Sequence, residues 1–215
     1  MREGWNGQDA VWLEAVEPAR LARLIVPPDV CTAAFAGGQL TRLWPSGVKP
    51  AGSALEHAEI CLLTRPSART LCFAVRDVLP CAVPGLAEPM HVGMSLSVPV
   101  RPGAFSGLYR LWEQAEKPPG LTLRHAYVAA LRTPMEEIWR AAAAEVCGGT
   151  PPPRSEWPGL TDRLIEAARG GTTALLMRFG LLCAGPCSVL GIAPLSAPAP
   201  EAAAMKNRLT TGGNG

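Results

Sequence analysis

The sequence has no long hydrophobic run and no apolar leader. No stretch reaches the roughly 18 uninterrupted apolar residues that a membrane-spanning helix requires. The nearest candidate, residues 174–195, is interrupted by Arg178, three glycines and two prolines. The first residues contain no uncharged apolar core followed by a small-residue cleavage pattern, so no secretory signal is predicted. We therefore expect a cytoplasmic protein that contacts a membrane only indirectly or peripherally.

The chain also lacks a strong charge of either sign. Its 20 Lys and Arg residues nearly balance 18 Asp and Glu residues, which leaves a net charge of +2 over 215 residues. A nucleic-acid-binding domain needs a concentrated positive surface, so no DNA or RNA partner is predicted. Arg65, Arg69 and Arg76 follow one predicted hairpin, but a solvated face is a commoner use of such residues than a basic strip for an acidic partner.

Catalytic motifs are absent as well. A nucleophile needs a base to activate it and a third group to orient that base. The three histidines, His57, His91 and His125, are scattered, and neither a G-x-S-x-G nor an H-E-x-x-H motif occurs. The adjacent pair Glu136-Glu137 lies in a predicted helix, where neighbouring side chains point about 100° apart, so it indicates a solvated helix surface. These absences favour a non-enzymatic protein.

Seven cysteines are present, which raises the question of a disulfide framework or a metal site. Their odd number, the missing secretory signal and their apolar neighbours predict reduced, mostly buried thiols. Only Cys183 and Cys187 are close together, and their spacing matches neither a CxxC redox motif nor a metal-ligand pair. We therefore predict no metal and no cofactor. The alternative is a small cysteine-dependent enzyme or redox protein, with Cys72 or Cys81 beside His91.

Glycine and proline, 22 residues each, favour many short elements joined by turns. Short apolar runs between Leu24 and Val100 are typical of strands. Gly37-Gly38 is followed by alternating residues and not by a helix, so it predicts a hairpin turn rather than a phosphate-binding loop. The predicted strands are 30–35, 39–43, 58–63, 70–75 and 91–100.

Beyond residue 103 the pattern becomes helical. Apolar residues at helical spacing predict helices over 104–116, 121–146 and 160–179. Pro134 is expected to kink the second helix or start a new one, and Gly170-Gly171 to break the third. A closing strand follows over 180–193, and the tail is predicted to be disordered.

Strands followed by helices indicate an α+β fold, with a mostly antiparallel N-terminal sheet covered by C-terminal helices and completed by a closing strand. The expected organisation is an N-terminal arm over residues 1–23, one domain over 24–195 and a disordered tail over 196–215.

Six tryptophans are many for this length, and aromatic side chains dominate interface energetics when they fill a partner's pocket. Trp112 and Trp139 lie on apolar helix stripes, which indicates core positions. The remaining candidates occur where core periodicity is weak, and they are predicted to contact a partner protein or a membrane surface: Trp5, Trp12, Leu13 and Trp157.

Four stretches carry a family resemblance. VPPDVCTAAFAGGQLTRLWPSGVKP has a strand, a glycine turn, a second strand and a proline-glycine corner, and AEICLLTRPSARTLCFAVRDVLP follows as a strand pair. MHVGMSLSVPVRPGAF leads into the first long helix, and LLMRFGLLCAGPCSVLGIAPL ends as helix, glycine and closing strand. In pattern and order, residues 24–195 resemble the SPFH or Band 7 domain of stomatins, prohibitins and flotillins.

The resemblance implies a scaffold, because members assemble into rings or cages, often at membranes, and organise other proteins there. Members usually carry a membrane-inserting segment before the domain and a long coiled coil after it, and this sequence shows neither. The version expected here is a compact homo-oligomer or subunit of a larger protein assembly. A third possibility is a binding module for a small apolar ligand between sheet and helices.

Overall fold

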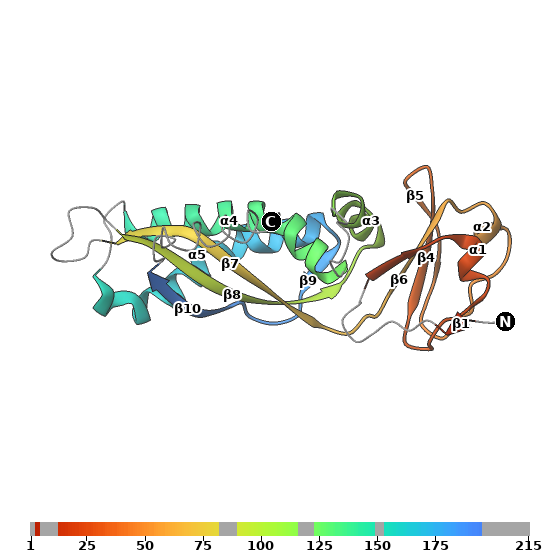
Figure 1. The fold of residues 1–215 in the computed structure, drawn as a ribbon, viewed down its shortest axis with the longest axis horizontal. Coiled ribbons are helices and arrows are strands. Elements are labelled where there is room, and N and C mark those ends of the chain that lie inside the picture. Colours follow the sequence, from red (N-terminus) through yellow and green to blue (C-terminus); the bar gives the residue numbers. More distant parts are fainter. Residues whose placement is uncertain (1–2, 5–12, 82–89, 116–122, 149–152, 195–215) are drawn as a thin grey trace, which may run out of the picture.

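The computed structural model describes residues 3–4, 13–81, 90–115, 123–148 and 153–194. It confirms an α+β fold with antiparallel sheets in the N-terminal half and helices in the C-terminal half. The molecule is elongated, with a compact N-terminal sheet at one end and a long hairpin covered by helices at the other (Figure 1).

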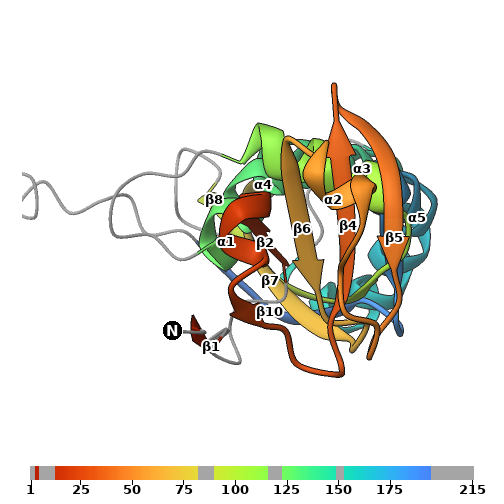
Figure 2. The ribbon, with the colours of Figure 1, turned by 90° about the vertical axis from the view of Figure 1, so that its right-hand side faces the viewer.

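The N-terminal sheet has the strand order β2-β6-β4-β5. Its strands are β2 (Leu13–Val16), β4 (Cys31–Ala36), β5 (Gln39–Trp44) and β6 (Ile60–Thr64). Two short helices, α1 (Pro18–Leu21) and α2 (Ser53–Glu56), pack at its outer end, where β1 (Glu3–Gly4) pairs in parallel with β3 (Leu24–Ile25). Figure 2 shows this sheet from that end.

The turn between β4 and β5 is formed by Gly37 and Gly38, as the sequence predicted. Both have positive φ, 56° and 72°, which glycine adopts without steric cost. The backbone N–H of Gly37 donates a hydrogen bond of 2.8 Å to the carboxylate of Glu59. This carboxylate comes from the residue just before β6, so the turn binds an anionic group of its own chain.

Strand β4 is buried on both faces. Ala33 and Phe35 belong to the large core shared with the helices, whereas Ala34 packs in a second core with Trp44, Cys61 and residues near α1 and α2. The double burial explains why CTAAFA is nearly continuous in apolar residues and does not alternate with polar ones.

The second sheet is built on a long hairpin, β7 (Arg69–Cys81) and β8 (Met90–Pro102), with β9 (Leu181–Cys183) and β10 (Ser188–Pro194) on the other side of β8. Leu71, Phe73 and Val75 of β7 are buried, while Cys72 and Arg76 are exposed. The alternation places one face of this sheet against the helices and the other face toward solvent.

Three longer helices complete the fold: α3 (Phe105–Gln114), α4 (Leu123–Cys147) and α5 (Trp157–Arg178), the last preceded by the 3₁₀ turn η1 (Arg154–Glu156). Helices α4 and α5 lie along β7 and β8, and α3 stands between this layer and the N-terminal sheet (Figure 1). Their apolar stripes bury Leu131, Trp139 and Leu164 completely or nearly so.

Helix α4 continues through Pro134, so of the two alternatives at this residue a second helix start is excluded. The predicted break at Gly170-Gly171 is wrong, because α5 continues through both residues. A Cβ atom at Gly171 would lie only 2.9 Å from a methyl carbon of Ile138 on α4. The glycine therefore allows the two helices to approach each other, and their packing offsets its low helix propensity.

The expected organisation also needs correction. Residues 1–23 were predicted to form an arm, but β2 pairs along its whole length with β6 and supplies buried Leu13 and Val16. The front-half strands were predicted to form one sheet, but β7 and β8 pair with each other and with the C-terminal strands in a separate sheet. The predicted tail, 196–215, and residues 1–2 and 5–12 of the arm lie outside the described residues.

A glycine contact joins the start of α3 to the end of α5. Gly180, with φ of 69°, accepts hydrogen bonds at its carbonyl from the N–H groups of Gly103 (2.8 Å) and Ala104 (3.1 Å). A Cβ at Gly180 would overlap the Ala104 carbonyl oxygen, and one at Gly107 would overlap the Gly180 backbone. We call this contact the Gly180 junction.

We expect Gly180→Ala to lower the free energy of unfolding by about 3–5 kcal/mol, because a strained positive φ and a backbone overlap act together. Gly148→Ala is the matched control. Gly148 has φ of 58° but nothing within 4 Å of the added carbon, so the conformational cost of about 1–2 kcal/mol should act alone. Urea denaturation measures the free energy of unfolding of both variants. An equal decrease in the two variants would contradict the role given to the Gly180 junction.

Candidate functional site

The outer strands of the two sheets differ in how far the helices cover their backbone groups. On strand β2, the Leu13 carbonyl accepts a buried hydrogen bond of 3.0 Å from the hydroxyl of Tyr127 on α4. Burial, assisted by the charge of Glu14, raises the pKa of Tyr127, so the hydroxyl stays protonated and remains a donor. One side of the N-terminal sheet is thus bound to the helical layer.

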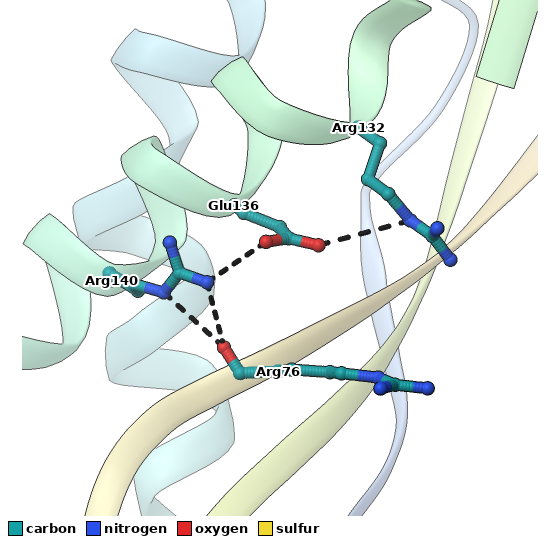
Figure 3. Close-up of polar contacts among 4 residues, drawn as sticks. All are labelled: Arg76, Arg132, Glu136 and Arg140. Carbon is teal, nitrogen blue, oxygen red and sulfur yellow. Dashed lines mark hydrogen bonds and ion pairs between the residues drawn. The ribbon is translucent and has the colours of Figure 1, made fainter. Parts of the chain in front are cut away.

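Strand β7 is covered by an arginine of α4 (Figure 3). Arg140 donates from Nε (3.3 Å) and Nη2 (3.2 Å) to the Arg76 carbonyl, where the pairing with β8 becomes irregular. The Glu136 carboxylate makes an ion pair with Nη2 of Arg140 at 2.9 Å, and its other oxygen lies 3.8 Å from Nε of Arg132. The sequence assigned Glu136 to a solvated helix surface. In the structure its carboxylate positions Arg140, which donates to the Arg76 carbonyl of β7.

Strand β5 has no described strand on its outer side. Its first five residues, Gln39 to Leu43, are all exposed, and Leu40 and Leu43 retain 39% and 45% of their accessible surface. An outer strand of this kind presents unpaired backbone donors and acceptors to another chain. The candidate functional site is therefore an interaction surface at β5.

A bulge places both leucines on one face of the sheet. Leu40 is opposite Phe35 and Leu43 is opposite Ala33, with a register shift between the two pairs. Phe35 and Ala33 are two residues apart and share a face, so their partners share it too. Without the extra residue in β5, residues 40 and 43 would point to opposite faces.

Aromatic side chains of α3 continue this face. Tyr109 stacks on Phe35 with ring centroids 4.6 Å apart, and Trp112 lies 5.5 Å from Tyr109. Loss of hydration raises the pKa of Tyr109, and its hydrogen bond to Glu113 and the charges of Glu113 and Glu59 raise it further. We define the β5 surface as residues 39–43 together with Tyr109 and Trp112.

Of the four residues chosen from the sequence, Leu13 alone has a described side chain. Leu13 was predicted to contact a partner, but it is completely buried in β2, where it packs in the main core, so that prediction is wrong. Trp5 and Trp12 lie outside the described residues. Trp157 begins α5, and its side chain is also outside the described part. No sequence signal beyond the glycine turn pointed to Leu40 and Leu43.

A second surface feature lies at the outer end of the N-terminal sheet. A groove of about 410 Å³ runs between residues 21–28 and 47–51, with Leu55 at its edge. Ile25 and Val48 are exposed beside it, and Lys49 is its one positively charged lining residue. Because β1 pairs with β3 here, the start of the chain returns to this groove.

The three arginines do not form the basic strip that the sequence left as the less favoured alternative. Arg65 makes a 2.8 Å ion pair with Asp29, and Arg69 and Arg76 occupy odd and even positions of β7, which face opposite sides of the sheet. The alternative pairing of Cys72 with His91 is not formed either, and the side chain of Cys81 lies outside the described part of the chain. Cys72 is opposite Ser97 of β8, six residues or about 20 Å along the strand from His91.

The six cysteines whose side chains are described are free thiols. Cys183 and Cys187 line one cavity of about 250 Å³ between α4, α5 and the chain that joins β9 to β10. Ile165, Arg169, Thr173 and Trp139 also line it. We call it the thiol cavity.

Within the described ranges, no three His, Cys, Asp or Glu side chains are grouped closely enough to bind a metal ion. None of the described helices has both the length and the apolar content needed to cross a bilayer.

Thiol accessibility gives a direct test of the site geometry. With a maleimide at about neutral pH, Cys72 and Cys183 should be modified first, because both are exposed. Cys61 should be modified last, because burial removes access and raises its pKa to about 11. Peptide mapping by mass spectrometry over time measures the order, with urea-unfolded protein as the control. Modification of Cys61 before Cys72 would contradict the structure.

Comparison with known proteins adds no name to these features. No family model matches the chain, and no curated protein matches it either.

Proposed function

We propose that this chain is a non-enzymatic scaffold or assembly protein that self-associates through the β5 surface. One observation carries the proposal: an outer strand exposed over five residues, with two leucines on the same face beside an aromatic pair. The copies are proposed to pair β5 with β5 in an antiparallel manner about a two-fold axis, the commonest symmetry of soluble oligomers.

The energetics favour an association that depends on side chains as well as backbone. Strand pairing satisfies backbone groups that water already satisfies, so its net gain per hydrogen bond is only about 0.5–1.5 kcal/mol. Burying a leucine side chain contributes about 1.5–3 kcal/mol when the burial is complete. Leu40 and Leu43, together with the edge of Tyr109, are therefore expected to supply most of the specificity.

The competing outer strand, β10, is less suited to pairing. It contains Gly191 and Pro194, and its pairing with β8 shifts register between Val189 and Gly191. Proline, glycine and irregular pairing are features that discourage strand addition at an edge. Leu190 is exposed there, at 63%, without a second exposed leucine on β10, so β10 provides a comparison for β5.

The resemblance to SPFH domains agrees with an assembly role and stays a prediction. In this proposal the protein is a compact cytoplasmic subunit whose contact with a membrane is indirect or peripheral. The alternative, a cysteine-dependent enzyme or redox protein, is supported by one feature, the placement of Cys183 and Cys187 in the same cavity.

The test compares the double variant Leu40→Asp/Leu43→Asp with the wild-type chain. Because both copies of a two-fold dimer carry the change, the variant removes four leucines from the interface, each partly exposed in the free chain. Association should weaken by at least about 3 kcal/mol, or roughly 100-fold in the dissociation constant. Sedimentation velocity and native mass spectrometry over a concentration series measure this constant. Both leucines are partly exposed, so circular dichroism should show an unchanged fold.

Leu190→Asp is the control, because it makes the same type of substitution, with one negative charge in place of two, at an exposed leucine of the other sheet. It should leave the dissociation constant unchanged. A wild-type chain that stays monomeric at high concentration would refute self-association. A double variant that assembles as well as wild type would refute the β5 surface as its site.

A further inference from the structure

The segment between β9 and β10 is a bulge that leaves the sheet. Cys183 is opposite Val100 of β8 and Ser188 is opposite Ser97. Four residues, 184–187, therefore face only two residues of β8. The N–H of Ala184 still donates to the Pro99 carbonyl at 2.9 Å. The extra residues that leave the sheet are therefore 185–187.

The bulge places both thiols on the helix side of the sheet. Cys183 shares its face with Val100, which is completely buried against the helices, and its Sγ lies 3.9 Å from the Thr173 hydroxyl of α5. Cys187 packs against the main core and lines the thiol cavity together with Cys183. Cys72 is exposed on the opposite face of the same sheet.

The two thiols differ in environment. Cys183 is exposed, whereas Cys187 is half-buried. Burial raises the pKa of Cys187, the nearby Cys183 raises it further, and Arg169 of α5 lowers it. Both side chains line the same small cavity, which places the two thiols near each other. Cys183 is therefore the thiol that a reagent from solution reaches first, and Cys187 is placed to react second.

The cavity also has room and donors for a small polar oxidant. Its volume of about 250 Å³ is several times the roughly 30 Å³ that a water molecule occupies in the liquid. Trp139 on its wall is 1% exposed, and its indole N–H has no hydrogen-bond partner in the described part of the chain.

We propose that the thiol cavity is an oxidation site at which a small hydroperoxide converts Cys183 and Cys187 into a reversible disulfide. Cys183 attacks the peroxide, the O–O bond breaks, and the products are a sulfenic acid on Cys183 and water or an alcohol. Cys187 then attacks that sulfur, the S–O bond breaks, and water leaves. The two thiols lose two electrons in total, and the hydroperoxide gains them. An external dithiol reverses the reaction.

The experiment treats the full chain with one equivalent of hydrogen peroxide, blocks the remaining thiols with a maleimide, and maps the tryptic peptide 179–206, which contains both cysteines. The expected product is this peptide two hydrogens lighter and without maleimide. Cys72 should carry maleimide throughout, which makes it an internal control. Reduction with dithiothreitol before blocking should restore two maleimide adducts.

Ring closure should be faster at about pH 9 than at about pH 7, because the attacking Cys187 must be deprotonated and its pKa is raised. In Cys187→Ser, oxidation should stop at a sulfenic acid on Cys183, which dimedone traps. Two maleimide adducts on wild-type peptide 179–206 after peroxide treatment would overturn the proposal, as would oxidation of Cys72 at the same rate.

A second measurement does not depend on any variant folding correctly. Phenylarsine oxide bridges two thiols only when they are close together, so the unmodified chain should bind one equivalent across Cys183 and Cys187. Failure to form this bridge would refute the proposed geometry. These outcomes are independent of the β5 surface, so either proposal can fail while the other holds.

Discussion

The Gly180 junction is the constraint on which the rest of the structure depends. Because neither Gly180 nor Gly107 has a side chain, the end of α5 and the start of α3 meet backbone to backbone. The contact orients α3, whose Tyr109 then stacks on Phe35 and connects the N-terminal sheet to the helical layer. It also directs the chain into β9, which pairs with the end of β8 and leads to the bulge at Cys187.

The outer strands differ in whether side chains of the helical layer hydrogen-bond to their backbone. The helical layer brings Tyr127 to β2 and Arg140 to β7, so polar groups of α4 satisfy carbonyls on two strands that would otherwise be open. Strand β5 lies beyond the reach of α4 and keeps an exposed edge beside α3. In an assembly protein, this asymmetry would leave β5 open for binding and discourage uncontrolled pairing at β2 and β7.

The two proposed sites arise from the same kind of irregularity. An extra residue in β5 aligns Leu40 with Leu43, and surplus residues before β10 turn Cys187 toward the helices. The turn, the strands and the close cysteine spacing could be predicted from the sequence, but these irregularities could not. Each is a mismatch between two paired strands, so neither strand alone contains it. Leu13 was misjudged for the same reason, because only its pairing with β6 shows that it is buried.

The sequence by itself determined the fold class, the positions of most elements and the glycine turn, because hydrophobic periodicity and positive-φ glycines act over a few neighbouring residues. Only the tertiary structure decided that the strands divide into two sheets, that α5 continues through Gly170-Gly171, and which leucines and thiols share a surface. These features depend on which elements pack together. Contacts between residues distant in the chain, such as Gly171 with Ile138, outweigh the local preferences that the sequence displays.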